Sequence, residues 1–349
     1  MDAEEDTKMK KQINPNIQAH LLQGTFYVLL LVAVCANPFA LAQRNVAKQS
    51  VAELGSASKG TLGVGKALPA AIIVVTNTND SGPGSLRQAL VDANDGDTIN
   101  FDSSLNGQKI TLTSGQLNVD KDVTISGLGA NNLAVDGSAQ SRVFYVNPGK
   151  TVTIEGLTVG NGHSDFGGGI YNGDATLTVS NCTVIGNSAT ATGGGISNGG
   201  FTFGSATLTV TNCTLIGNSA YGGGGISNEG DVGSATLTVT NCTLIGNSAY
   251  GGGGILNAAG FEGSSMATIS NSTISGNSAD YGGGGIDNGG GGNAFAALTI
   301  TNSTLSGNSA DSGGGIYNSE AGLGTGNTIF DAGASGENIF NSGGNLARL

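Results

Sequence analysis

The chain has 349 residues, of which 62 are glycine, only 11% are charged, and the formal net charge is −12. Charged residues make up about 25% of ordinary soluble domains, so this surface must consist largely of Thr, Ser, Asn and Gly. Residues 151–347 contain no Lys or Arg. Because nucleic acids and anionic membranes are bound through basic side chains, we expect this stretch to bind neither.

Residues 1–42 have the features of a Sec-type signal peptide. Basic residues precede an apolar run over 26–36, and an Ala-x-Ala cleavage site ends at Ala42. The run is shorter than the about 20 residues of a membrane span, although an uncleaved anchor is the alternative. We therefore expect export to the outside or the cell surface of a bacterium, with membrane contact only through export or an anchor. Residues 43–69, rich in Ala, Gly, Ser and Lys, are predicted to be a flexible linker.

Residues 70–150 are predicted to form an N-terminal cap and the first, irregular coils of the fold. The apolar run over 72–76 indicates a strand, and residues 77–84 indicate a turn. Residues 85–94 have the apolar spacing of a short helix, with Ser85 as its N-cap. A helix at this place would cover the open end of the fold that follows.

Residues 151–318 consist of repeats of about 30 residues. The segment 207–220 recurs almost unchanged at 236–249, and apolar residues alternate with Thr within each unit, as in half-buried strands. A unit this short cannot bury its apolar face alone, but stacked units can pair every strand in parallel with its copies. A β-propeller needs blades of about 40 residues and four strands. The repeats therefore predict a parallel β-helix, whose last coil would be 319–349.

Equivalent residues of stacked coils should form columns. Leu177, Leu208, Leu237 and Leu298 would form one interior column, and the Ile that follows each Gly run another. The Asn of each Gly-Asn-Ser-Ala turn would form a hydrogen-bonded ladder, or would be a surface turn residue in the left-handed conformation. This predicted ladder comprises Asn187, Asn218, Asn247, Asn277 and Asn308.

Two motifs resemble those of exported bacterial proteins. Gly84-Ser-Leu-Arg-Gln-Ala89, followed by 97–101 and 110–117, is similar to a segment known from its Cys-Ser-Leu-Arg-Glu-Ala motif, with Gly84 and Gln88 as departures. The Gly-Gly-Gly-Ile and Gly-Asn-Ser-Ala repeats resemble those of polymorphic outer-membrane proteins. The resemblance covers about 70–349. It implies export and an all-β, right-handed parallel β-helix, a single-stranded β-solenoid like that of pectate lyases, but no specific activity.

Residues for catalysis are few in the repeats. His163, Asp165 and Asp174 form the most reactive local set, and the alternative is turn-forming Asp with a solvated His. A lyase that acts on uronates needs a basic side chain, which 151–347 lacks, whereas glycoside hydrolysis needs only two carboxylates. The two histidines and the scattered Asp residues predict no metal site and no cofactor.

Three cysteines share one register of the repeats. Cys182, Cys213 and Cys242 would stack in consecutive coils, and Ser272 and Ser303 replace them later. Export permits a disulfide, but stacked side chains point in parallel and their number is odd. Small buried residues and one strained disulfide both remain open.

Two outward-facing sets could bind a ligand. Thr-x-Thr pairs should form a flat grid, with about 4.8 Å between coils and about 6.5 Å along each strand, which resembles the binding face of β-solenoid ice-binding proteins. The alternative is the ordinary preference of Thr for strands. The grid comprises Thr178, Thr209, Thr211, Thr238, Thr240, Thr268, Thr299 and Thr301. Tyr221, Tyr250 and Tyr281 share another register and could stack on sugar rings.

The sequence as a whole favours a secreted or cell-surface binding or structural module, adhesin-like and without catalysis. Its expected partner is a polysaccharide or a host or cell-surface glycan, and we expect a monomer. Two alternatives stay open. One is a glycoside hydrolase or lyase that acts on polysaccharide, and the other is binding to ice or another surface through the Thr grid.

Overall fold

The computed structural model describes residues 70–200, 204–291, 293–326, 328–330, 338–342 and 345–348. The predicted signal peptide and linker, residues 1–69, lie outside this part of the chain. No helix within the described ranges is long and apolar enough to cross a membrane.

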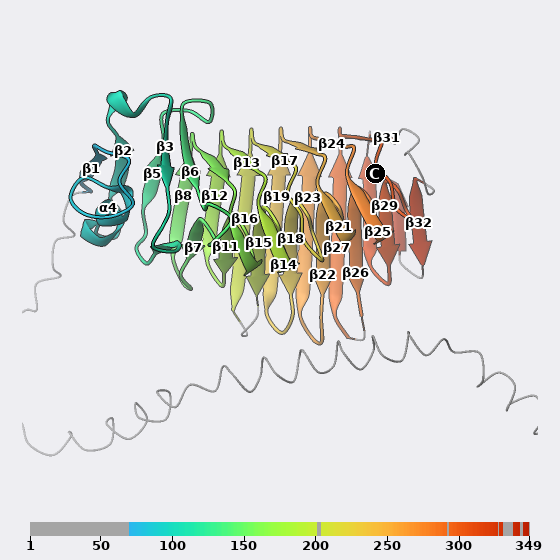
Figure 1. The fold of residues 1–349 in the computed structure, drawn as a ribbon. Helices are drawn as coiled ribbons and strands as arrows, with labels where there is room; N and C mark the ends of the chain where they lie inside the picture. Colours follow the sequence, from blue (N-terminus) through green and yellow to red (C-terminus); the bar gives the residue numbers. More distant parts are fainter. Residues whose placement is uncertain are drawn as a thin grey trace, which may run out of the picture. The chain divides into compact units, whose positions relative to one another are not determined.

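The described residues wind into a solenoid with three parallel sheets, and each regular coil gives one strand to each sheet (Figure 1). The strands of sheet A are β1 (Ile72–Val75), β2 (Thr98–Phe101), β5 (Thr124–Ser126), β8 (Thr151–Glu155), β12 (Thr176–Ser180), β16 (Ser205–Thr211), β19 (Ser234–Thr240), β23 (Ser264–Ser270), β27 (Phe295–Thr301), β30 (Gly322–Gly326) and β33 (Asn345–Arg348). The strands of sheet B are β3 (Gln108–Thr111), β6 (Leu133–Asp136), β9 (Thr158–Gly160), β13 (Thr183–Ile185), β17 (Thr214–Ile216), β20 (Thr243–Ile245), β24 (Thr273–Ser275), β28 (Thr304–Ser306) and β31 (Ile329–Phe330). The predicted parallel β-helix is confirmed.

Sheet C closes each coil, and a narrow ribbon of strands precedes it. The strands of sheet C are β4 (Leu117–Val119), β7 (Phe144–Val146), β11 (Ile170–Gly173), β15 (Ile196–Gly200), β18 (Ile226–Gly230), β22 (Ile255–Ala259), β26 (Ile286–Gly290), β29 (Ile316–Ser319) and β32 (Ile339–Ser342). The ribbon, here called ribbon D, consists of β10 (His163–Phe166), β14 (Ser188–Thr192), β21 (Ser248–Gly251) and β25 (Ser278–Gly282), joined by parallel bridges through 219–222.

The core is built from columns of aligned apolar residues. Leu177 pairs in register with Leu208, and Leu208 with Leu237, and all three are fully buried. Ala267 takes the next place in this column before Leu298. The Ile at the start of each sheet C strand is also buried, as in Ile226. Since each burial of a Leu or Ile side chain is worth roughly 1.5–3 kcal/mol, the columns provide the main stabilisation of the solenoid.

A sharp turn joins ribbon D to sheet C in every regular coil. At Gly223 the backbone has φ +64°, and a Cβ there would lie 2.4 Å from the carbonyl oxygen of Ile226. Only glycine fits, because any side chain would be both strained and in collision with the backbone. This turn folds ribbon D back over the outward face of sheet C.

A short helix covers the N-terminal end, as predicted. Helix α4 (Leu86–Asp92) begins after Ser85, whose side chain accepts a hydrogen bond from the backbone N–H of Gln88. Leu86, Ala89 and Leu90 are buried against the first coils. A single 3₁₀ turn, η1 (Ser103–Leu105), follows within the described N-terminal coils.

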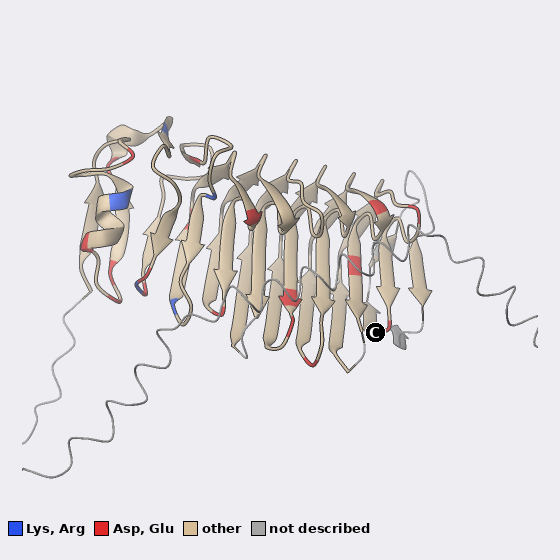
Figure 2. Ribbon diagram, turned by 60° about the horizontal axis from the view of Figure 1, so that its bottom comes forward, with Lys and Arg blue, Asp and Glu red and all other residues tan. Residues whose placement is uncertain are grey.

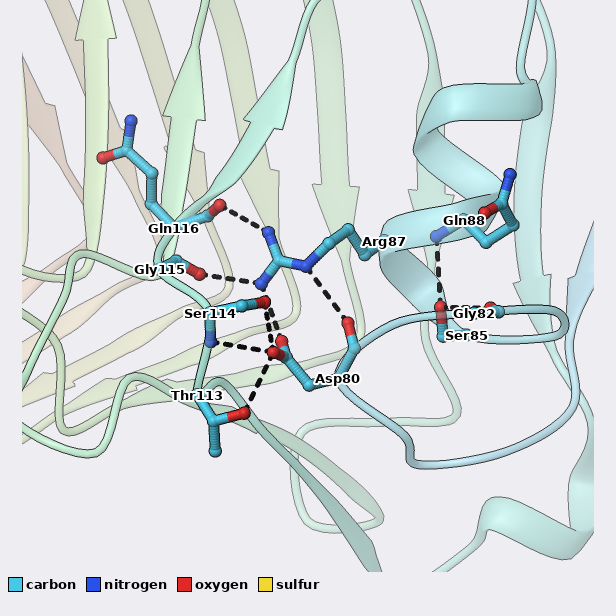
Figure 3. A network of polar contacts seen from close by, with 9 residues as sticks. All are labelled: Asp80, Gly82, Ser85, Arg87, Gln88, Thr113, Ser114, Gly115 and Gln116. Atoms are coloured by element: carbon cyan, nitrogen blue, oxygen red, sulfur yellow. Dashed lines mark hydrogen bonds and ion pairs between the residues drawn. The ribbon is translucent and has the colours of Figure 1, made fainter.

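Arg87 of α4 joins the cap to the first coils. Its guanidinium lies 2.7 Å from Asp80 Oδ1 and donates to the carbonyl oxygens of Gly115 and Gln116, each at 2.7 Å (Figure 3). Asp80 also accepts hydrogen bonds from Ser114 and Thr113. Burial by itself would raise the pKa of Asp80, but these hydrogen bonds and the charge of Arg87 lower it to about 2. We call this network the Arg87 latch.

The turn from sheet A to sheet B uses the three cysteines. The Asn before each of them has a positive φ, such as +54° at Asn212. The next residue turns inward: the backbone N–H of Cys182 donates to Sγ of Cys213 at 3.4 Å, and that of Cys242 donates to Oγ of Ser272 at 3.1 Å. All three thiols are buried and free, so the disulfide alternative is wrong for this structure. Ser can replace Cys in later coils because its hydroxyl accepts the same bond.

Two ladders of Asn side chains, buried except at Asn341, run along the axis. In the predicted ladder, Asn218 Nδ2 donates to Asn247 Oδ1 at 2.9 Å, and Asn247 Nδ2 to Asn277 Oδ1 at 2.9 Å. All members are at most 1% exposed, so they are not surface turn residues. The second ladder lies inside sheet C and was not predicted. It comprises Asn172, Asn198, Asn228, Asn257, Asn288, Asn318 and Asn341, linked at 2.6–2.7 Å.

Candidate binding faces

The outward face of sheet A carries the Thr grid. Thr209 pairs in register with Thr238, and Thr211 with Thr240, across strands β16 and β19. The first column comprises Thr178, Thr209, Thr238, Thr268 and Thr299, and the second Ser180, Thr211, Thr240, Ser270 and Thr301. These side chains are half-buried, except the exposed Thr268. Neighbouring hydroxyls approach one another, as between Thr240 and Ser270 at 3.2 Å.

This face has no charge over five consecutive strands. The outward positions of β12, β16, β19, β23 and β27 hold only Thr, Ser, Met266, Ala297 and Phe295. In Figure 2 the blue segments, Lys and Arg, lie towards the N-terminal coils, and red segments occur singly along the solenoid. By strand geometry the five strands span about 19 Å along the axis. The result is a flat, neutral array of hydroxyl groups.

Sheet B carries a Thr column of its own, which the sequence analysis missed. Thr214 of β17 pairs with Thr243 of β20, and both are half-buried like the Thr residues of sheet A. Here the neighbouring outward residues are apolar, such as Ile185 and Ile245, which are 40% and 38% exposed. The two faces therefore share threonine but differ in what surrounds it.

The three predicted tyrosines lie on ribbon D and stack on one another. Tyr221 and Tyr250 have ring centroids 4.9 Å apart, and Tyr250 and Tyr281 5.7 Å, with 8° between the planes of each pair. Their side chains are 44–62% exposed. Because each ring covers the face of the next, the exposed parts are mainly ring edges and hydroxyls. Sugar rings would need a free ring face, so they cannot stack between these tyrosines.

His163 and Asp165 lie on ribbon D, whereas Asp174 lies elsewhere. His163 and Asp165 are exposed on β10, where His163 Nδ1 lies 2.8 Å from Ser188 Oγ and Asp165 accepts from Thr190 at 2.6 Å. Asp174 follows β11 of sheet C in a left-handed turn, with φ +50°. The three residues thus lie in two different parts of the coil, ribbon D and the turn after sheet C.

Two half-buried acidic residues were not predicted as a pair. Glu229 of β18 and Asp287 of β26 face outward from sheet C but lie beneath ribbon D. Burial raises the pKa of Glu229, an effect that the hydroxyls of Thr192 and Ser227 only partly offset. Burial likewise raises the pKa of Asp287, to about 7. The sequence pattern does not predict the burial of Glu229 and Asp287, because the ribbon that covers them comes from another part of each coil.

The separation of Glu229 and Asp287 disfavours a glycosidase pair. Asp287 is in register with Ser227 two coils away, and Glu229 lies two residues further along its strand. Strand geometry then places the Cα atoms of Glu229 and Asp287 about 12 Å apart, on strands whose outward side chains point in the same direction. Glycosidases hold their two carboxyl groups about 5–9.5 Å apart. Among the described residues, no three His, Cys, Asp or Glu side chains are grouped to hold a metal ion.

Asp287 should make the stability depend on pH. Its folded pKa of about 7 lies above the ordinary pKa of an Asp carboxyl, 3.8, so the folded chain holds this proton more tightly than the unfolded chain does. The free energy of unfolding should therefore be highest below about pH 4 and fall by up to about 4 kcal/mol as the pH rises through 7. We expect Asp287→Asn to remove most of this fall, as measured by urea unfolding between pH 4 and pH 8.

The control for Asp287→Asn is Asp280→Asn. Asp280 is exposed on β25, so this variant also removes one negative charge, but the charge that it removes is in contact with water. Equal gains from both variants at pH 8 would mean that net charge, and not the burial of Asp287, causes the pH dependence.

No family model matches the chain, and no curated protein matches it. Among solved structures, the chain is similar to one described as the crystal structure of pectate lyase Pel9A. The TM-score is 0.49 with 15% sequence identity, over 78% of this chain and 78% of that chain. The strand pairing of the chain itself shows that it is an all-β parallel β-solenoid with a short helix at its N-terminal end.

Proposed function

We propose that the chain is a non-catalytic binding module that presents the outward face of sheet A to an uncharged polysaccharide of a cell or host surface. The observation that supports this most is the registered array of Thr and Ser hydroxyls over five strands without any charge. Such a flat face suits a repetitive, extended ligand better than a small molecule, which needs a concave pocket.

Hydroxyl groups match a neutral glycan chemically. Each can donate and accept, so a row of Thr can bond with sugar hydroxyls in either direction. The Thr methyl groups lie beside them and can contact the CH groups of the sugar. Water-mediated bonds at such a wet face are nearly as favourable as direct ones. A polysaccharide that meets many equivalent rows gains affinity by multiple weak contacts.

Export supports the same function. The signal-peptide features of 1–42 and the resemblance of the repeats to polymorphic outer-membrane proteins both indicate a place outside the cell or at its surface. The low content of charged residues and the absence of Lys and Arg from 151–347 disfavour nucleic acid as the partner. We propose that the module acts as a monomer, in the manner of an adhesin.

Charged side chains on the outward face of sheet A should weaken the binding of polysaccharide. We expect Thr209→Lys with Thr238→Lys to weaken co-sedimentation with insoluble cellulose, chitin or xylan by about tenfold or more, since two bulky charges would interrupt adjacent rows and must be desolvated on contact. The matched control is Thr214→Lys with Thr243→Lys, which changes the same residue type in the same coils on sheet B. Binding should remain within about twofold in that control.

Three outcomes would contradict the proposal. Equal loss in both double variants would mean that sheet A is not the specific face. Failure to bind any neutral polysaccharide would exclude the proposed ligand class. Release of reducing or unsaturated ends from a polysaccharide would instead favour the alternative, a hydrolase or lyase, and would overturn the non-catalytic assignment.

Ice is the second candidate ligand of the same face. The specific observation is that a Thr column and a mixed Thr and Ser column lie in register on one sheet, with about 4.8 Å between coils and about 6.5 Å along the strand. Thermal hysteresis of the purified chain, lost in a variant with Thr209→Tyr and Thr238→Tyr, would support this candidate. No hysteresis at millimolar concentration would exclude it.

A further inference from the structure

The tyrosine stack on ribbon D ends in an open ring face. Two of the three rings are closed on both sides: Tyr250 lies between its neighbours, and Tyr281 has Tyr317 beyond it, with centroids 5.6 Å apart, a 60° tilt and hydroxyl oxygens 3.5 Å apart. Tyr221 is covered only by Tyr250 within the described stack. Its side chain is 62% exposed, the most of the three.

Small side chains lie in front of this open face. The bridges Ser188–Ser219 and Thr192–Gly222 align the preceding coil with Tyr221 and leave Thr190 and Ala191 opposite the ring. The side chain of Thr190 is fixed, because its hydroxyl donates to Oδ1 of Asp165 in the coil before it at 2.6 Å. A tyrosine ring reaches several ångströms further from the backbone than a threonine. The surface therefore has a step, with Tyr221 as its wall and Thr190 and Asp165 as its floor.

The chemistry of the step is that of a sugar site. Aromatic faces bind apolar CH groups, and a carboxylate accepts hydrogen bonds from hydroxyls. Coils are about 4.8 Å apart, which leaves room for one ring in van der Waals contact with Tyr221. Asp165 is exposed, and the cation beside its strand, Arg142, is half-buried and donates to Ser164 Oγ and to the carbonyl oxygens of Phe166 and Gly167. A carboxylate on the ligand would therefore meet the charge of Asp165 and not a free cation, so we expect an uncharged ligand.

We propose that this step binds a single uncharged pyranose unit, which stacks its CH face on Tyr221 and donates hydroxyl hydrogen bonds to Asp165. The site is separate from the sheet A face, because ribbon D lies between the strands of sheets B and C in each coil. It would bind soluble sugars or chain ends, whereas the sheet A face would bind extended surfaces.

The decisive variant is Thr190→Tyr. It places a fourth ring in the step and continues the stack, so the fold should be kept while the open face is closed. Binding is measured by saturation-transfer NMR with neutral disaccharides (cellobiose, maltose, lactose, xylobiose and mannobiose) and by tyrosine fluorescence, which is not masked because the chain has no Trp. We expect binding by wild type and a loss of about tenfold or more in Thr190→Tyr, equal to about 1.4 kcal/mol.

Further variants separate stacking from other effects. Tyr221→Phe should bind within about twofold of wild type, and Tyr221→Ala should lose binding, because the ring face and not the hydroxyl makes the contact. Asp165→Asn should weaken binding severalfold, since it weakens one acceptor. Asp311→Tyr, which adds a ring to the coil beyond Tyr281, is the matched control for Thr190→Tyr and should not change affinity.

The proposal is overturned if none of these disaccharides transfers saturation, if Thr190→Tyr binds like wild type, or if glucuronate binds as well as glucose does. The two proposed sites can be tested separately, because each variant should affect only one of them. The Thr209→Lys and Thr238→Lys variant should keep its affinity for the disaccharide, and Thr190→Tyr should keep co-sedimentation with insoluble polysaccharide.

Discussion

Replacing Asn247 by Ala should lower the free energy of unfolding by about 3–5 kcal/mol, one of the two largest effects that we expect from a single substitution. Oδ1 of Asn247 accepts from the backbone N–H of Asn218 at 3.0 Å and from its Nδ2 at 2.9 Å, and Nδ2 of Asn247 donates to the carbonyl of Leu215 at 3.1 Å. All these groups are buried, so water cannot replace the lost partner. Each orphaned buried group costs about 1–3 kcal/mol.

The control for Asn247→Ala lies in the same coil. Asn241 is exposed at a turn with φ +55°, a conformation that glycine adopts freely. Asn241→Gly should change stability by no more than about 0.5 kcal/mol. Urea unfolding of both variants measures the difference. A loss below about 1 kcal/mol in Asn247→Ala would show that the ladder is not a stabilising network.

The second large effect is expected from Arg87→Met, which should lower stability by about 3–5 kcal/mol and release the N-terminal cap first. The side chain of Arg87 is 23% exposed, and that of Asp80 only 12%. Without Arg87 the Asp80 carboxylate loses its counter-charge in a partly buried place, and the carbonyls of Gly115 and Gln116 lose their donor. Hydrogen exchange should show early opening of α4 and β1, while the coils after β8 stay protected.

Lys121→Met is the control for the Arg87 latch. Lys121 pairs with Asp120 at 3.1 Å, and the two side chains are 32% and 54% exposed. Exposed ion pairs contribute little, so this variant should cost less than about 1 kcal/mol. If both variants lower the free energy of unfolding by the same amount, or if hydrogen exchange begins at the C-terminal end of the solenoid, the Arg87 latch does not stabilise the N-terminal cap.

The Arg87 latch should also show in acid. The folded pKa of Asp80 is about 2, below the ordinary pKa of an Asp carboxyl, 3.8, so the folded state favours the ionised form. Its contribution is complete above about pH 4 and is lost as the pH falls towards 2. Asp287 acts in the opposite direction, because burial makes its ionised form unfavourable. The contribution of Asp80 is lost below about pH 4 and that of Asp287 above it, so these two groups together should make wild type most stable near pH 4.

The sequence by itself determined the parallel coils, their register and the first Asn ladder. Near-identical repeats stack so that equal residues meet, and the alternation of apolar residues with Thr decides which face is inside. The second ladder could have been found in the same way. Asn198 follows Ile196 by two residues, as Asn228 follows Ile226, so each Asn must point inward with its Ile.

Only the tertiary structure decided what ribbon D covers and which tyrosine face stays open. The left-handed turn at each Gly run folds ribbon D over sheet C, and this partly buries Glu229 and Asp287 although their strand positions point outward. Likewise, a shared register predicts that Tyr221 and Tyr250 are neighbours, but not that their rings stack face to face. Alternation within one strand tells inside from outside, whereas burial by a ribbon and the tilt of a ring depend on contacts between segments whose placement no local pattern encodes.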